Sequence, residues 1–235
     1  MSFISYLING ISLGSVYAII ALGYTMVYGI AKMLNFAHGD VIMVGAYIVL
    51  TCVTGAGLNP IIIATIACTI FGVVIEGVAY RPLRNAASPL AVLITAIGVS
   101  YLLQNLALLI FGSNTKSFPE VIKLPNLKLA GGKLTITGTT ILTIVLCIVI
   151  MAGLMLFINK TKAGQAMLAV SEDTGAATLM GINVNKTISM TFAIGSALAA
   201  IAGVLLCSAY PSLTPYTGSM PGIKAFVAAV FGGIG

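Results

Sequence analysis

The chain has 235 residues, of which 59% are hydrophobic and only 7% are charged, and its formal net charge is +6. Soluble domains contain about 25% charged residues, so this composition excludes an ordinary soluble protein and predicts an integral membrane protein. Its spans should be helices, because strands of a membrane barrel would alternate apolar and polar residues with a period of two. The positive charge is spread over loops, which favours a role in membrane orientation and argues against a nucleic-acid partner.

Long uncharged runs, interrupted by turn signals such as "TGAGLNP", divide into segments that approach the roughly 20 residues needed to cross a bilayer as a helix. The expected fold is all-α: a polytopic membrane helix bundle of about seven spans, forming a single transmembrane domain over residues 1–235. The chain stops within the seventh span, at "FGGIG", so we expect it to be truncated. The expected helices are 10–30, 38–54, 60–80, 90–112, 137–158, 187–209 and a seventh that starts near 223.

Alternation of the spans between the two membrane sides places the segments 31–40, 81–89 and 159–186 together. This side has six basic residues and the other has four, so the positive-inside rule weakly favours a cytoplasmic location for the first. The loop 113–136 is then extracytoplasmic, and its "LKLAGGKLTITG" stretch predicts a β-hairpin that turns at Gly131–Gly132. The six basic residues are Lys32, Arg81, Arg84, Lys160, Lys162 and Lys186.

The sequence lacks the motifs of common enzymes. It contains no phosphate-binding G-x-x-x-x-G-K-[ST], no H-E-x-x-H and no G-x-S-x-G. One histidine cannot supply a metal cluster, and the four cysteines lack C-x-x-C spacing, so they should be packing residues. No catalytic residue, cofactor or metal is therefore expected, and transport is the default function for such a chain.

The loop 159–186 contains "SEDTGAATLMGI", which predicts a short helix. Asp173 can cap its start, Glu172 adds negative charge at that end, and Gly181 can take the left-handed closing position. An apolar knob on an otherwise polar loop indicates docking to a partner, although a surface helix lying on its own protein explains the pattern equally well. The knob consists of Ala176, Ala177, Leu179 and Met180.

The stretch "LNFAHGD" at 34–40 places polar residues between two apolar runs. One interpretation starts the second helix near the cytoplasmic boundary, with Asn35 as a turn or cap residue and His38 at headgroup depth. The other is a break in the helix that exposes polar groups, with Asn35, His38 and Gly39 in a translocation path or gate. Asp40 deep in lipid would cost about 2.5 to 3.5 kcal/mol, so it should be paired or lie at an interface.

Other polar residues in the spans are expected to be structural. Glu76 and Arg81 should form an interfacial ion pair near a helix end. Gln104 and Asn105 should form hydrogen bonds between helices, and contact with a transported substrate is the alternative for both.

Along nearly its whole length, the chain closely resembles the permease subunits of ABC importers for branched-chain amino acids. Several unusual strings occur in the same order, which makes the resemblance specific. The family usually has glutamate where this chain has Asp40. The matching stretches are "NGISLGSVYAIIALGYTMVYGI" (9–30), "NFAHGD" (35–40), "VAYRPLR" (78–84), "AIGVSYLLQN" (96–105), residues 171–182 and "TPYTGSMPGIKAFVAAVFGGIG" (214–235).

The resemblance implies a multi-pass protein of a bacterial or archaeal inner membrane that imports branched-chain amino acids as ATP is hydrolysed by other subunits. The implied partners are a second permease subunit, two cytoplasmic ATP-binding subunits, an extracytoplasmic solute-binding protein and membrane lipid. Residues 159–186 would be the cytoplasmic coupling loop. A urea or short-amide importer of the same family and a gradient-driven secondary transporter are the alternatives.

Overall fold

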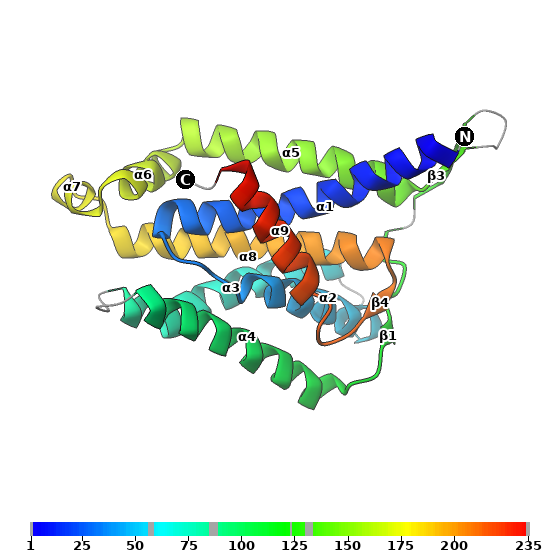
Figure 1. Cartoon of the computed structure of the whole chain (residues 1–235), viewed down its shortest axis with the longest axis horizontal. Helices are drawn as coiled ribbons and strands as arrows, with labels where there is room; N and C mark the ends of the chain where they lie inside the picture. Colours follow the sequence, from blue (N-terminus) through cyan, green and yellow to red (C-terminus); the bar gives the residue numbers. More distant parts are fainter. Residues whose placement is uncertain (1, 56–58, 85–88, 123, 130–133, 234–235) are drawn as a thin grey trace.

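A computed structural model describes residues 2–55, 59–84, 89–122, 124–129 and 134–233. Nearly all of these residues are helical or link helices, as expected for an all-α bundle (Figure 1). The helices are α1 (Ser2–Ala31), α2 (His38–Gly55), α3 (Pro60–Ile75), a π-helix η1 (Glu76–Tyr80), a 3-10 turn η2 (Arg81–Leu83), α4 (Pro89–Phe111), α5 (Gly138–Lys160), α6 (Lys162–Glu172), α7 (Thr174–Leu179), α8 (Val184–Ala209) and α9 (Ser219–Gly232).

Five of these helices are long and apolar enough to cross a membrane: α1, α3 with its continuation, α4, α5 and α8. Two shorter apolar helices, α2 and α9, complete the seven elements expected from the sequence. The chain is therefore a polytopic helical membrane protein.

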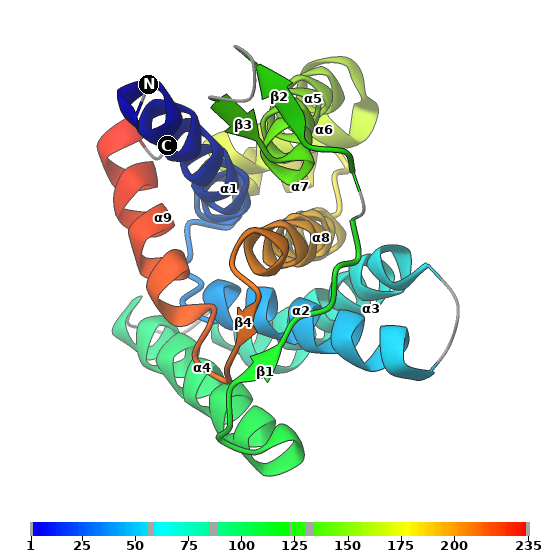
Figure 2. The same cartoon turned by 90° about the vertical axis from the view of Figure 1, so that its right-hand side faces the viewer.

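Helix α8 lies at the centre of the bundle, with α1, α2 and α3 packed around it (Figure 2). Its sequence between Ile194 and Gly203 is rich in alanine, glycine and serine, and small residues allow membrane helices to approach closely. In the most apolar stretch of α8, 72% of residues are buried, against 11% in α5. Helix α5 thus lies at the periphery, and α8 supplies the common packing surface.

Close contact between α2 and α8 depends on glycine. A Cβ atom added to Gly203 would overlap the carbonyl oxygen of Ile42, and one added to Gly45 would lie 2.9 Å from the Cα of Ala200. Backbone cannot move aside as the end of a flexible side chain can. These two glycines therefore set the distance between the helices.

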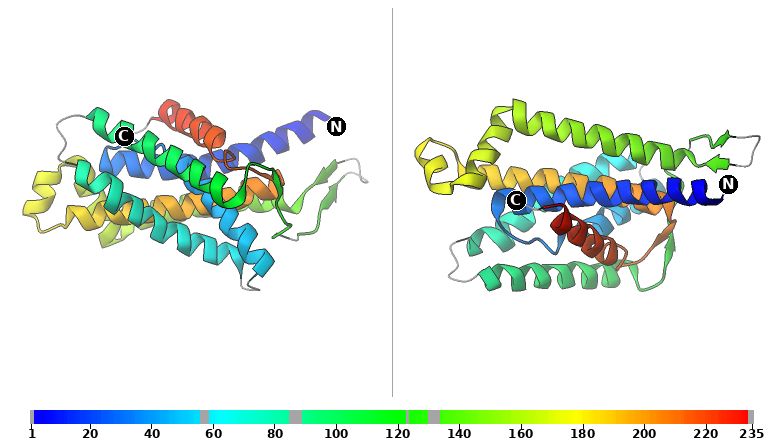
Figure 3. Two further views of the ribbon diagram at one scale, coloured as in Figure 1. Left: turned by 90° about the horizontal axis from the view of Figure 1, so that it is seen from below. Right: turned by 45° about the horizontal axis from the view of Figure 1, so that its top comes forward.

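The two ends of the bundle differ in structure (Figures 1 and 3). Helices α6 and α7 project from one end, where α1 and η2 also finish. Short antiparallel strands occupy the other end: β2 (Leu127–Leu129) pairs with β3 (Leu134–Ile136), and β1 (Lys116–Ser117) pairs with β4 (Ser212–Leu213). The hairpin strands are confirmed, while the expected turn at Gly131–Gly132 lies outside the described residues.

Two expected helix starts were wrong, and one helix was not expected. Helix α1 begins at Ser2, well before residue 10, and α9 begins at Ser219, because Pro221 fits in a first turn that needs no amide donor there. Residues 162–172 form α6, although a loop was expected. This helix is capped by Thr161 and buries one side through Gly164, Met167 and Val170.

The close packing of α8 predicts that Gly203→Ala destabilises the protein. Overpacking of this kind costs about 1–3 kcal/mol, and thermal unfolding of the purified protein in detergent measures it. Gly14→Ala in α1 is the matched control, because an added Cβ there meets nothing within 4 Å, and alanine favours a helix by up to about 1 kcal/mol. Equal shifts for the two variants would contradict this account of the packing.

Candidate functional site

The link between α1 and α2 turns back into the bundle. Residues 32–37 contain no helix, Lys32 has a positive φ of 53°, and the link runs from the end of α1 towards the middle of the bundle, where α2 begins (Figure 1). His38 and Asp40, at the start of α2, are each 1% exposed. Both side chains therefore lie inside the bundle and not on its surface.

His38 is seated on α1. Its ring lies edge-on to Tyr24, with ring centroids 4.6 Å apart, and it occupies the space that a side chain at Gly23 would fill. Within the described residues, its Nε2 atom has no hydrogen-bond partner.

Asp40 is held by neutral hydrogen-bond donors from α4. Ser100 donates its hydroxyl to one carboxylate oxygen, and Gln104 donates from Nε2 to the other at 3.0 Å. Gln104 also contacts the Ser219 hydroxyl of α9 at 3.1 Å. The interhelical hydrogen bonding expected of Gln104 is confirmed, and the cluster joins α2, α4 and α9.

The starts of α2 and α9 touch through their backbones. A Cβ on Gly39 would lie 2.8 Å from the carbonyl oxygen of Gly218, and one on Gly222 would lie 2.9 Å from the Cα of Gly39. Any side chain at these three positions would force the helices apart. The contact places Ser219 beside Gln104, and thereby completes the cluster around Asp40.

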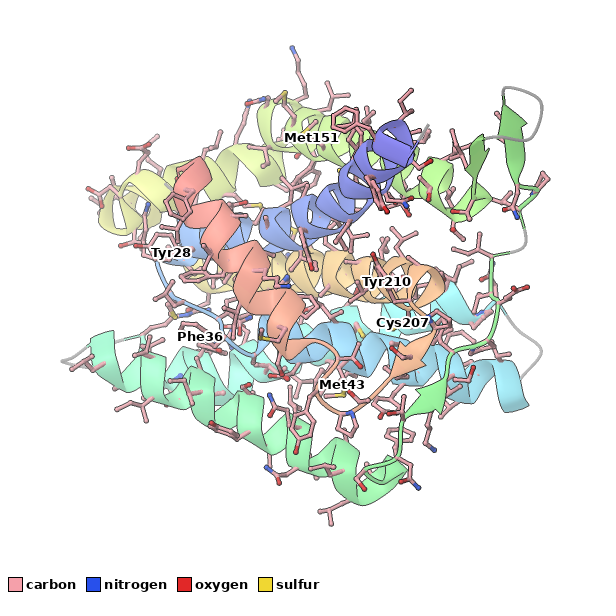
Figure 4. The ribbon with its side chains drawn as sticks, turned by 45° about the vertical axis from the view of Figure 1, so that its right-hand side comes forward. Tyr28, Phe36, Met43, Met151, Cys207 and Tyr210 are labelled. Atoms are coloured by element: carbon pink, nitrogen blue, oxygen red, sulfur yellow. The ribbon has the colours of Figure 1, made fainter. Side chains whose placement is uncertain are left out.

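A cleft of about 330 Å³ opens beside this cluster. One part of its lining is polar and the rest is aromatic or aliphatic. Phe36, labelled in Figure 4, packs against Phe226 of α9, with the two ring centroids 5.6 Å apart. The lining residues are Tyr24, Phe36, Gly39, Asp40, Ile97, Ser100, Tyr101, Gln104, Ser219 and Ile223.

Asn35 is anchored from the π-helix that follows α3. The Tyr80 hydroxyl donates to Asn35 Oδ1 at 2.7 Å, and both residues are buried. The Tyr80 ring lies 5.3 Å from that of Phe192 in α8. Asn35 is also a turn residue, as one interpretation expected, because its carbonyl oxygen accepts from the His38 amide at 3.1 Å. The link between α1 and α2 is therefore tied to the core of the bundle.

Glu76 forms a second polar cluster at the end of the bundle where α7 lies. It pairs with Arg84 and accepts a 2.5 Å hydrogen bond from the Ser189 hydroxyl of α8. The expected ion pair with Arg81 is present, with the Arg81 Nε 3.7 Å from the Glu76 carboxylate and the Arg81 side chain half exposed. Arg84 is the closer partner, which was not expected, because the 3-10 turn after the π-helix brings it back to Glu76. Arg84 also donates to Asn185 of α8.

Helix α7 has the expected caps. The Asp173 carboxylate accepts from the amides of Gly175 and Ala176 at 2.7 and 3.0 Å, and Gly181 has a φ of 82°. Leu179 and Met180 are 89% and 82% exposed, whereas Ala177 is buried.

The apolar knob therefore consists mainly of Leu179 and Met180, and including Ala177 in it was wrong. Ala177 lies on the face of this short helix that packs against the rest of the protein. Ala176 and Glu172 are exposed beside the knob.

Asn105 does not belong to the cleft. Its Nδ2 donates to the carbonyl oxygen of Tyr101, one turn earlier in α4, and its side chain is exposed. The expected hydrogen bond between helices was wrong for this residue, because successive residues of a helix are rotated by about 100° and Asn105 is exposed while Gln104 is buried. The sequence also gave no signal for Ser100 and Ser219, which only the tertiary fold brings to Asp40.

Long apolar helices packed around buried polar side chains make this a multi-pass membrane protein. Residues 6–235 match the model of the family described as branched-chain amino acid transport system / permease component. The chain belongs to this family.

Curated relatives agree with this assignment. The high-affinity branched-chain amino acid transport system permease protein BraD of Pseudomonas aeruginosa is 44% identical, over 99% of this chain and 80% of that protein. The protein LivH of Escherichia coli, which carries the same description, is 40% identical over the same shares. A probable LivH of Methanocaldococcus jannaschii is 32% identical over 92% of this chain and 70% of its own length. No solved structure shows significant similarity.

The Tyr80–Asn35 hydrogen bond predicts that Tyr80→Phe lowers the free energy of unfolding by about 1–3 kcal/mol, because it leaves a buried acceptor unsatisfied. Tyr47→Phe is the matched control: Tyr47 is also buried, and its hydroxyl has no hydrogen-bond partner among the described residues. Removing that hydroxyl should be neutral or stabilising. Chemical denaturation in detergent compares the two variants, and equal losses would show that the Asn35 anchor contributes nothing.

Proposed function

We propose that this chain is the membrane-spanning subunit of an ATP-driven importer and that it carries branched-chain amino acids into the cell. The family match over residues 6–235 is the observation that carries the proposal. The names of BraD and LivH supply the substrate class. ATP hydrolysis takes place in separate subunits, so the chain's own task is to open and close a path.

The end of the bundle that carries α6 and α7 is the cytoplasmic end in this proposal. Six basic residues, Lys32, Arg81, Arg84, Lys160, Lys162 and Lys186, belong to this end, in line with the positive-inside rule. Leu179 and Met180 then project into the cytoplasm. An exposed apolar pair on a doubly capped helix suits docking into a groove of an ATP-binding subunit. Residues 113–136 face the outside, where a solute-binding protein delivers the substrate.

The complex contains a second permease chain and two ATP-binding subunits, in the inner membrane of a bacterium or archaeon. Asn35, His38, Gly39 and Gln104 belong to the translocation path or gate. Support comes from the irregular link at 32–37, since non-helical backbone inside a membrane protein is tolerated where it lines a cavity or is buried in protein. Asn105 lies on the outer face of α4, so we leave it out of the path.

Uptake in proteoliposomes tests the ATP-driven proposal. The chain is reconstituted with its partner subunits, and leucine uptake is measured with ATP on the cytoplasmic side and an uncoupler present. We expect uptake to require ATP and to survive the uncoupler. Complete loss of uptake at constant ATP would indicate a gradient-driven transporter, and import of urea without leucine would indicate the short-amide alternative.

The coupling proposal predicts that Leu179→Asp abolishes co-purification of the ATP-binding subunits and reduces uptake at least about tenfold. The side chain is 89% exposed in the isolated chain, so the fold should be unaffected, while a charge in an apolar docking contact is unfavourable. Leu127→Asp is the matched control: Leu127 is a half-exposed leucine at the other end of the bundle.

The control should retain the ATP-binding subunits. Retention by Leu179→Asp as well would show that α7 is an ordinary surface helix.

A further inference from the structure

Among the described residues, Asp40 has no basic partner. In the part of the chain that the structure describes, both ion pairs involve Glu76, and Asp40 receives hydrogen bonds from neutral groups alone. Glu76 is equally buried but neutralised by Arg84. The two buried acids therefore differ in their partners: Glu76 is paired with arginine, and Asp40 has neutral hydrogen-bond partners alone.

An unpaired carboxylate inside a membrane bundle is costly, and such residues usually mark the path of a cation or a charged substrate. An ionised carboxylate has about four acceptor positions. Ser100 and Gln104 provide one hydrogen bond each, so further acceptor capacity remains. Asp40 can thus receive an additional donor from the cleft.

The cleft beside Asp40 combines two chemical surfaces. Asp40, Ser100, Gln104 and Ser219 form its polar part, and aromatic and aliphatic side chains such as Phe36, Ile97 and Ile223 form the rest. Its volume of about 330 Å³ lies at the lower end of the range for small-molecule sites, which is about 300–1,000 Å³. A cationic group next to a short branched aliphatic chain matches both surfaces.

We propose that the cleft is a transient binding site for the transported amino acid, in which Asp40 binds the substrate's ammonium group and the apolar lining receives its side chain. The inference rests on the proposed function and adds a contact within the permease itself. Ser100 and Gln104 act as positioning residues that hold the carboxylate towards the cleft. The competing explanation is that Asp40 only ties α2 to α4.

Cysteine protection tests the site in the assembled complex, in membrane vesicles without the solute-binding protein. Ile97→Cys introduces a thiol on the cleft wall, where Ile97 is 40% exposed, and its alkylation by N-ethylmaleimide is followed. We expect leucine and 3-methylbutylamine, which both carry an ammonium group, to slow alkylation. 4-Methylpentanoate, with the same branched chain and no ammonium group, should not. Equal protection by all three compounds, or by none, would overturn the proposal.

Asp40→Asn in the Ile97→Cys background should remove the protection and reduce ATP-driven leucine uptake by at least about tenfold, because hydrogen bonds to charged groups are the stronger ones. Asp40→Glu keeps the charge and should retain most of the uptake. If the Asp40→Asn variant kept the uptake and the protection seen in the parent, the site proposal would be wrong, and Asp40 would only tie α2 to α4. A parent complex that imports no branched-chain amino acid would instead refute the proposed function. The ligand comparison with native Asp40 decides the question even if Asp40→Asn fails to assemble.

Discussion

The backbone contact between the starts of α2 and α9 determines the geometry of the site. Gly39, Gly218 and Gly222 allow it because none of them has a side chain to separate the helices. Without it, Ser219 would not reach Gln104, and the cluster around Asp40 would lose its third helix. Helix starts that meet within a membrane bundle are a recurrent way to build polar sites in transporters.

The bundle contains two buried acidic residues, Glu76 and Asp40, whose partners differ. Glu76 is paired with arginine and accepts a hydrogen bond from a hydroxyl of α8, and Arg84 in turn bonds to an amide of α8, so the cluster stabilises the junction between α3 and α8. Asp40 is surrounded by neutral donors beside an open cleft. The two acids also differ in position: the Glu76 cluster lies at the start of α8, the helix that follows α7, whereas Asp40 lies where the link turns into the bundle.

Local chemistry made much of the fold predictable. Uncharged runs located the helices, and the Asp173 cap and Gly181 closure of α7 followed from residue type alone. The Glu76–Arg81 pair could be predicted from spacing, whereas the closer partner Arg84 depends on an irregular turn after α3, which apolar periodicity does not reveal. The partners of Asp40 come from positions 100, 104 and 219, so no local pattern could indicate them. Ala177 and Asn105 were misplaced because a short or uniformly apolar helix gives little indication of which side is buried.

The central position of α8 has a consequence for the order in which the protein assembles. Helices α1, α2 and α3 all pack on α8, yet about 110 residues separate the end of α3 from its start. At a synthesis rate of about 5–20 residues per second, roughly 5 to 20 s pass between the end of α3 and the start of α8, and longer for α1 and α2. Glu76 can pair with Arg81 and Arg84 soon after its synthesis, but the hydrogen bond from Ser189 has to await α8. The surfaces of α1, α2 and α3 that α8 covers in the finished bundle therefore lack that cover until α8 is made, and final packing follows its synthesis.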